Sequence, residues 1–369
     1  MPKSRKRRPH RRHQGRPPRS AEDDFTAALV SAAESSTPGP LLGVAAVMLD
    51  VTAGADDPGA HRQELVLGMA GSGRPETAAA AAAVATLLGD DELRRRVRRE
   101  VAESGLVLPR WLAELHRTEA LGRAVEISTV YRDADQLLVG ATVPGGYPLT
   151  AVVLVDNELG AFAADGFVVE ARLDDVAAIA LADVGEDACL RDIPPADARA
   201  RIEAAVRELD LGPGTGGYES WAQSRPLVTW VVGLQPAGGS ADALQELSED
   251  ELDDITDSFL ASPFGPAWAG ADLRPLVDEV VTAGSANGIG DPLVWSPDNV
   301  RKLLTPEFRM LDDSTPFLHR VPELLRDLIR YGHAERGLRP GLTAAALSAL
   351  DAAAGSFLAA VQDLDANES

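Results

Sequence analysis

Apolar and polar residues follow two different periods along this chain. Between residues 21 and 116 the apolar positions recur every three or four residues, which predicts amphipathic helices. The clearest case begins at Asp90 and Asp91, because acidic residues favour a helix start. In that segment Leu93, Val97 and Val101 share one face. We expect further helices around residues 25–30, over 41–49, over 76–88 behind Pro75, and briefly over 109–112.

The period changes near residue 124. Three runs rich in apolar and β-branched residues, 125–131, 136–143 and 149–155, are separated by short turns that contain Asp or Gly. A fourth run, 167–169, fits one more strand. Short turns between consecutive strands predict an antiparallel β-meander. A sheet this small needs helices to cover one of its faces.

Helical spacing returns from residue 174. Asp192 and the prolines after it start one helix, and Ser248 with Glu251 predicts a capping box for another that runs to Leu260. Further helices are expected to begin at Ser296, at Pro322 and at Thr343, the last of them amphipathic and running to Leu364. The run 227–234 fits either a strand or a buried helix.

These patterns together predict an α+β fold that is mostly helical, with a small central antiparallel β-meander of three to four strands. The chain has 369 residues, of which 45% are hydrophobic, so it can bury a sizeable core. We expect three segments: a disordered basic tail over 1–20, helices with the meander over 21–170, and a mainly helical region packed on it over 171–369.

The charge of the chain is divided unevenly. Residues 1–19 hold nine of the 35 basic residues and no acidic one, while the other 350 residues hold 26 basic and 57 acidic residues, a balance of −31. Such a tail favours contact with nucleic acid or another polyanion, and the body would repel one. The candidate polyanion-binding residues are Lys3, Arg5, Lys6, Arg7, Arg8, Arg11 and Arg12. A solubilising tail or an overlong start remains the alternative.

The common local motifs for cofactors and metals are missing. The glycine-rich segment 212–217 is followed by Tyr218 and Glu219, where a phosphate loop needs Gly-Lys-Ser/Thr. The acidic residues over 250–257 lack the spacing of a calcium loop. No two histidines have the i, i+4 helical spacing of a zinc site. His333 lies where it would complement the dipole at a helix end. We therefore expect no cofactor and no metal.

Composition also bears on the compartment. Cys189 is the one cysteine, so an intramolecular disulfide is excluded and a reducing compartment fits. No uninterrupted apolar run approaches the ~20 residues that span a bilayer, and acidic residues at 22–24 follow the basic tail where a signal peptide would be apolar. These features predict a cytoplasmic protein with no membrane contact. Three lysines against 32 arginines indicate a high-GC bacterial genome.

Asp156 is the acidic residue best placed for chemistry. It ends the third predicted strand, and strand ends on a rigid scaffold are frequent catalytic positions. An Asx turn formed by Asp156 and Asn157 is the alternative interpretation.

Four stretches, 108–112, 152–160 followed by 166–169, 261–265 and 291–297, resemble a family of uncharacterised actinobacterial proteins of this length that begin with a similar Arg-rich tail. The resemblance covers most of the chain from about residue 20, and its motifs are structural. It implies no established activity, cofactor or site residue. In that family a histidine often follows the strand-ending aspartate, and here Asn157 stands in its place.

Two functions follow as hypotheses. The first is a non-enzymatic interaction or regulatory protein, which binds an unknown protein partner or a copy of itself and whose tail contacts RNA or DNA without sequence preference. The second is an enzyme of unknown reaction with a site at the end of the meander near Asp156. The missing motifs favour the first.

Overall fold

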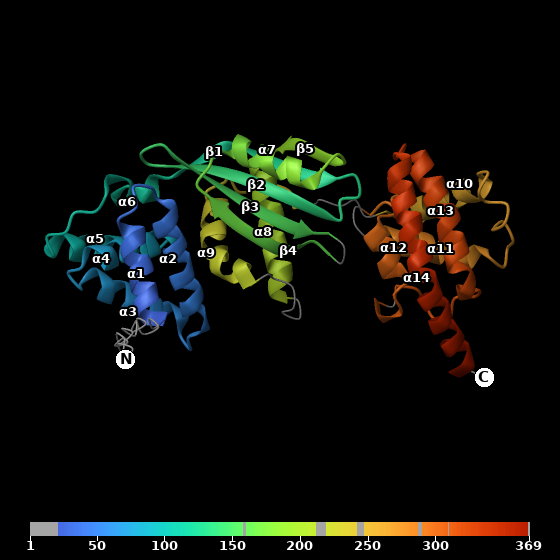
Figure 1. Cartoon of the computed structure of the whole chain (residues 1–369), viewed down its shortest axis with the longest axis horizontal. Coiled ribbons are helices and arrows are strands. Elements are labelled where there is room, and N and C mark those ends of the chain that lie inside the picture. The colour runs from blue at the N-terminus through green and yellow to red at the C-terminus, as the bar shows by residue number, and fades with distance from the viewer. Residues whose placement is uncertain are drawn as a thin grey trace, which may run out of the picture.

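The computed structural model describes residues 21–157, 160–211, 219–241, 247–286, 290–308 and 310–367. It is an elongated arrangement of three parts in chain order (Figure 1). Helices α1 to α6 form one end, a β-sheet with three helices lies in the middle, and helices α10 to α14 form the other end. The expected α+β fold, mostly helical with an antiparallel sheet, is confirmed.

The N-terminal part packs around an alanine-rich helix. Its helices are α1 (Ala21–Ala33), α2 (Gly39–Val51), α3 (Pro58–Ala70), α4 (Pro75–Leu87), α5 (Asp91–Glu103) and α6 (Arg110–Ala113), with short 3-10 turns at Thr52–Gly54 and Leu115–Arg117. Every residue of α4 from Ala78 to Leu87 is buried, because small side chains allow other helices to approach from all sides. Helix α3 was not predicted; it buries only Val66 and Ala70, too few positions to show a period.

The central sheet is antiparallel with the order β4-β3-β2-β1-β5. Its strands are β1 (Glu119–Thr129), β2 (Ala134–Val143), β3 (Tyr147–Asp156), β4 (Phe162–Val169) and β5 (Ala188–Ile193). The first four form the expected meander. The sheet among the described residues has five strands, one more than the upper limit of the expected three to four. The additional strand is β5, which pairs with the free edge of β1 from Ala124↔Ile193 to Thr129↔Ala188. This edge strand is largely exposed and carries Arg191 and Asp192, so it shows no apolar run.

Helices cover both faces of the sheet, whereas the sequence suggested one. Helix α7 (Leu173–Val184) packs on the face that carries Val125, Ile127 and Leu138. Helices α8 (Pro195–Leu211) and α9 (Glu219–Gly233) pack on the opposite face. The ambiguous run 227–234 belongs largely to α9, which contains Pro226. The segment boundary predicted after residue 170 falls between β4 and α7. Helices α7, α8 and α9 and strand β5, which follow that boundary, belong to the same central part as the meander.

The C-terminal part is helical, as expected. It contains α10 (Glu249–Ala261), α11 (Arg274–Ser285), α12 (Pro297–Leu303), α13 (Val321–Glu335) and α14 (Pro340–Asn367), with short 3-10 turns at Pro306–Phe308 and Leu318–Arg320. The capping box of Ser248 and Glu251 is present at the start of α10. The core of this part contains the buried Trp268 and Trp295. Helix α11 was not predicted.

Helix α14 is notable for its composition. Among the described residues, its segment Pro340–Asp363 is the one stretch long and apolar enough to cross a membrane by these two measures alone. Polar residues such as Thr343, Ser348 and Asp351 interrupt this segment, so it contains no long apolar run in the sequence. Its Ala346, Leu350, Phe357 and Val361 pack into the C-terminal core, which is how the core helix of a folded domain behaves.

Candidate functional site

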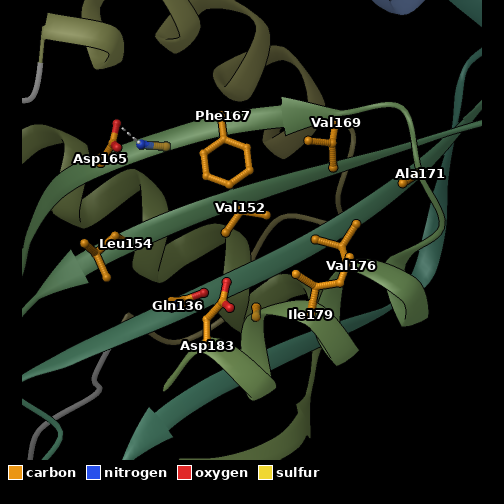
Figure 2. Close-up of a pocket in the computed structure, with 12 residues that line it drawn as sticks. Gln136, Val152, Leu154, Asp165, Phe167, Val169, Ala171, Val176, Ile179 and Asp183 are labelled. Atoms are coloured by element: carbon orange, nitrogen blue, oxygen red, sulfur yellow. Dashed lines mark hydrogen bonds between the residues drawn. The ribbon is translucent and has the colours of Figure 1, made fainter. Parts of the chain in front are cut away.

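An apolar groove lies on the sheet face that α7 only half covers. Its volume is about 440 Å³, and its lining is mostly aliphatic and aromatic. The floor is formed by Val152 and Leu154 of β3, one wall by Phe167 and Val169 of β4, and the other wall by residues of α7 (Figure 2). The size and the apolar lining are those of a binding groove.

The register of the sheet explains why these residues meet. Val152 is paired with Phe167, and Leu154 with Asp165 and Gln136, so their side chains share one face. On α7, Val176 and Ile179 are one turn apart and face them across the groove (Figure 2). Phe167 is 47% exposed and Ile179 is 65% exposed, which is unusual for large apolar side chains that face each other.

The wall at β4 is fixed from behind. A Cβ atom at Gly166 would lie 2.6 Å from the ring of Trp221, which packs against the other face of the sheet from α9. Glycine therefore allows the indole to approach the strand closely. The same glycine donates its N–H to the carboxylate of Asp165 at 2.8 Å, and Ser224 donates its hydroxyl to the Gly166 carbonyl. Two backbone groups of this edge strand are thus already satisfied.

Two carboxylates mark the rim of the groove. Asp165 belongs to β4 and Asp183 to the last turn of α7, and both line the groove beside Gln136. Among the described residues, no basic side chain lines it. The groove therefore combines an apolar floor with a negative rim.

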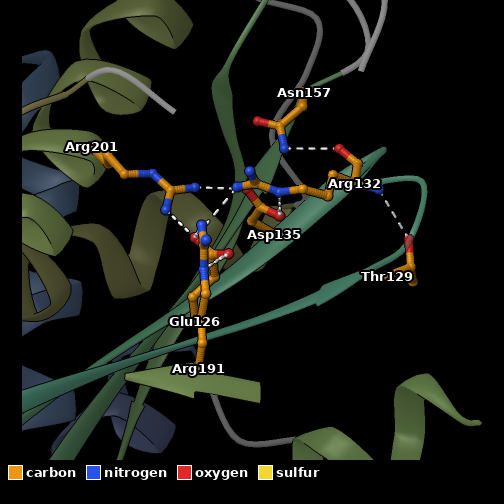
Figure 3. Close-up of polar contacts among 7 residues, drawn as sticks. All are labelled: Glu126, Thr129, Arg132, Asp135, Asn157, Arg191 and Arg201. Carbon is orange, nitrogen blue, oxygen red and sulfur yellow. Dashed lines mark hydrogen bonds and ion pairs between the residues drawn. The ribbon is translucent and has the colours of Figure 1, made fainter. Parts of the chain in front are cut away.

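A buried ionic network lies on the opposite face of the sheet (Figure 3). The carboxylates of Glu126 in β1 and Asp135 in β2 are both fully buried. Arg201 from α8 pairs with both of them, at 2.6 Å from Asp135. Arg132 lies 2.7 Å from Asp135, and Arg191 of β5 lies 2.7 Å from Glu126. Five charges from three strands, one turn and one helix are joined in this way.

The arginines decide the protonation state of Glu126. Burial alone would raise the pKa of its carboxyl, but hydrogen bonds from Arg191 and Arg201 outweigh burial, and the pKa falls below its usual value. Glu126 is therefore ionised at neutral pH and serves as an anchor for the two cations. A network whose two carboxylates are buried is suited to holding α8 and β5 against β1 and β2.

A second polar cluster lies where the sheet meets the C-terminal helices. Burial raises the pKa of Asp133, in the turn before β2, to about 6, although Ser296 at the start of α12 hydrogen-bonds to it. Burial also raises the pKa of Asp156. Lys302 of α12 interacts electrostatically with both carboxylates, and burial lowers its pKa. Asp156, the residue on which the enzyme hypothesis is centred, thus interacts electrostatically with a group from the C-terminal helices.

The remaining residues that the sequence offered as candidates for a functional site are located as follows. Lys3, Arg5, Lys6, Arg7, Arg8, Arg11 and Arg12 lie outside the described residues, as does the segment 212–217. Cys189 is exposed on β5. His333 does not complement a dipole as a cation: it is buried, its Nε2 accepts the N–H of Trp295, and burial lowers its pKa. Among the residues that the structure describes, no group of three or more acidic, His or Cys side chains is placed to hold a metal ion.

Neither the groove nor the ionic network was predicted from the sequence. Phe167 was assigned to a strand, but nothing in a single sequence says which neighbouring helix leaves it uncovered. Asp135 was placed in a turn, whereas it belongs to β2 and is buried. A signal did exist for Glu126, since it interrupts the apolar run 125–131.

Comparison with known proteins returns no match: no family model, no curated protein and no solved structure is detectably similar to the chain. The resemblance to uncharacterised actinobacterial proteins therefore stays a prediction, and the function has to be argued from the geometry.

Proposed function

We propose that this chain is a non-enzymatic interaction protein that binds an amphipathic helix of a protein partner in the groove between α7 and β4. The carrying observation is the groove itself, in which Phe167 and Ile179 leave apolar surface exposed over a floor formed by β3. Exposed apolar surface of this kind is a frequent mark of an interaction site.

The β4 edge argues for a helix rather than an added strand. An added strand needs free backbone groups along the edge, but Asp165 and Ser224 already bind the N–H and the carbonyl of Gly166. A helix makes no such demand, since it inserts side chains at i, i+3, i+4 and i+7 into a groove. Helix α7 already packs in this manner on the neighbouring part of the same sheet face.

The rim argues for a partner with basic residues beside its apolar face. Asp165 and Asp183 are the charged groups of the lining, and the body as a whole carries a balance of −31. An acidic helix would be repelled, while Lys or Arg beside the apolar positions would pair with the rim and speed association.

A selection of helical peptides tests this proposal. A library on a helix-forming frame, with one face randomised, is selected against the intact chain, and the selected peptides are measured by fluorescence anisotropy. We expect apolar residues at i, i+3 or i+4 and i+7, flanked by Lys or Arg. Phe167→Glu and Ile179→Glu should each weaken binding at least tenfold.

The matched control is Val51→Glu, which adds the same charge at a residue that is 75% exposed at the end of α2. It should leave the affinity within about twofold. If the selected peptides bind the groove variants as tightly as the control, or if light scattering shows that the groove is filled by a second copy of the chain, the proposal is wrong.

The polyanion contact of the basic tail and a cytoplasmic location remain part of the proposal on sequence grounds. Nine basic residues without an acidic one support the tail contact. A reducing compartment is supported by the single cysteine.

The cluster of Asp133, Asp156 and Lys302 supports the second candidate, an enzyme with an acid–base site. A carboxyl whose pKa is about 6 can exchange protons near neutral pH. Lys302 gives a direct test, because the other two lysines are Lys3 and Lys6 of the tail. If the site is open to substrate, a small amine-reactive acylating reagent should modify Lys302 rapidly at pH 8. If the sheet and the C-terminal helices close over it, Lys302 should be protected from the reagent.

A further inference from the structure

We propose that the outer face of α5 is a second, folded contact for the phosphate backbone of nucleic acid, separate from the tail and from the groove. The central two turns of this helix carry Arg94, Arg95, Arg96, Arg98 and Arg99. Its apolar residues, Leu93, Val97 and Val101, are buried against the N-terminal helices. Arg95, Arg98 and Arg99 are therefore exposed, and Arg94 and Arg96 are partly exposed at the two sides of the buried face.

The basic surface extends beyond α5. Arg117, in the 3-10 turn before β1, is exposed beside His116. Burial lowers the pKa of His116, and the positive charges of Arg94, Arg117 and Arg98 lower it further, so these side chains occupy one neighbourhood. The two elements thus present one surface, here named the α5 basic face: Arg94, Arg95, Arg96, Arg98, Arg99 and Arg117.

Most of these arginines have no carboxylate partner. The side chain of Arg94 is 2.9 Å from Asp91, but within the described residues the side chains of the other five members of the α5 basic face make no hydrogen bond or ion pair. Elsewhere exposed arginines are commonly paired, as Arg225 is with Asp210 and Arg336 with Asp291. In a body so rich in carboxylates, unpaired cations gathered on one helix need another explanation.

The arrangement carries an electrostatic cost within the chain. Arg94 with Arg98, and Arg95 with Arg99, are like charges at i, i+4, and each such pair destabilises a helix by about 0.2–0.5 kcal/mol. The acidic residues of α5 lie at its two ends, at Asp91 and Glu92 and at Glu100 and Glu103. An external row of phosphates would relieve the repulsion in the centre.

The distribution of charge along the chain favours a polyanion as the partner and the N-terminal end of the molecule as its binding site. Residues 1–118 hold 18 basic and 15 acidic residues, a balance of +3, and residues 119–369 have a balance of −25. The tail precedes α1, which belongs to the same end of the molecule as α5 (Figure 1). A polyanion is therefore held at this end and repelled by the rest. Nucleic acid is favoured over an acidic protein because regularly spaced phosphates match two ridges of arginine, and arginine binds phosphate bidentately.

The test measures binding of the full chain to labelled 30-residue oligonucleotides, single- and double-stranded, of DNA and of RNA, between 50 and 200 mM salt. The variant replaces Arg95, Arg98 and Arg99 by Gln, which preserves helix propensity. The control replaces Arg225, Arg301 and Arg326 by Gln, with the same change in net charge. A third protein has the basic residues of the tail replaced by Gln.

We expect the α5 variant to bind at least tenfold more weakly at 100 mM salt, with its salt slope reduced by about 2 to 3, since each phosphate contact contributes about 0.7–0.9. The control should change affinity less than twofold. The tail variant should still bind, and should lose affinity further when combined with the α5 variant. The oligonucleotide that binds most tightly shows whether the preferred partner is DNA or RNA, and whether it is single- or double-stranded.

Three results would overturn the inference. The α5 variant could bind as the control does, which would leave the tail as the whole contact. The unmodified chain could fail to bind any oligonucleotide at 50 mM salt. Poly-glutamate or phosphatidylserine vesicles could compete more strongly than oligonucleotides of equal charge, which would point to an acidic protein or a membrane surface instead.

Discussion

Arg201 of α8 reaches into the layer beneath the sheet and places its guanidinium 2.6 Å from the buried carboxylate of Asp135. This contact joins residues 66 positions apart in the chain. It belongs to the network that joins α8 and the edge strand β5 to β1 and β2 on one face of the sheet, while the groove lies on the other face. The charges of the network therefore lie apart from the residues that line the groove.

Removal of Arg201 should be strongly destabilising. Arg201→Ala leaves two carboxylates buried with fewer cations, and breaking a buried pair in this way costs about 3–5 kcal/mol. Arg225→Ala, which breaks an exposed pair with Asp210, should cost about 0–1 kcal/mol. Urea unfolding of both variants measures the difference. Equal losses would show that the network contributes no more than a surface ion pair.

Asp133 predicts a stability that depends on pH. Because burial raises its pKa to about 6 from the ordinary 3.8 of an aspartic acid, the folded state binds the proton more tightly than the unfolded state. The chain therefore loses stability as pH rises from about 4 through 6. Asp133→Asn should remove this loss and stabilise the chain by about 1–3 kcal/mol at pH 8, with little gain at pH 4. A gain that is the same at both pH values would contradict the assignment.

Two glycines should respond to alanine in opposite directions. A Cβ at Gly332 of α13 would overlap the backbone of Leu293, so Gly332→Ala forces the segment before α12 away from the helix. The expected loss is about 1–3 kcal/mol. At Gly68 of α3 no atom lies within 4 Å of the added Cβ, and alanine should stabilise the helix by about 0.5–1 kcal/mol. Thermal unfolding distinguishes the two, and a loss at Gly68 would be inconsistent with this packing.

Periodicity predicted the parts of this fold that bury one clear face. Val97 of α5 and the alternating residues of β1 to β3 were placed correctly, and so was the capping box at Ser248, because each signal is local. Helix α3 and strand β5 were missed because they are mostly exposed and are stabilised by neighbours distant in sequence. Gly166 shows the same limit, since its role depends on Trp221, 55 positions later.

The candidate sites were less predictable than the fold. A charge count located the tail and suggested that any polyanion contact belongs to it alone. The arginines of α5 were visible in the sequence, but they were assigned only to a charged helix. Among the described residues, the side chains of Arg95, Arg96, Arg98 and Arg99 have no ion-pair partner, which is a property of the tertiary structure, as is the exposure of Ile179 beside Phe167.

Photo-crosslinking from the groove in the native cell tests the central claim most directly. A benzophenone amino acid replaces Ile179 in one strain and Val51 in another, and crosslinked peptides are identified by mass spectrometry. We predict one discrete adduct from position 179 that is absent from position 51, with the crosslinked segment an amphipathic helix flanked by Lys or Arg. The same adducts from both positions, or crosslinks from position 179 only to a second copy of the chain, would contradict the proposed function.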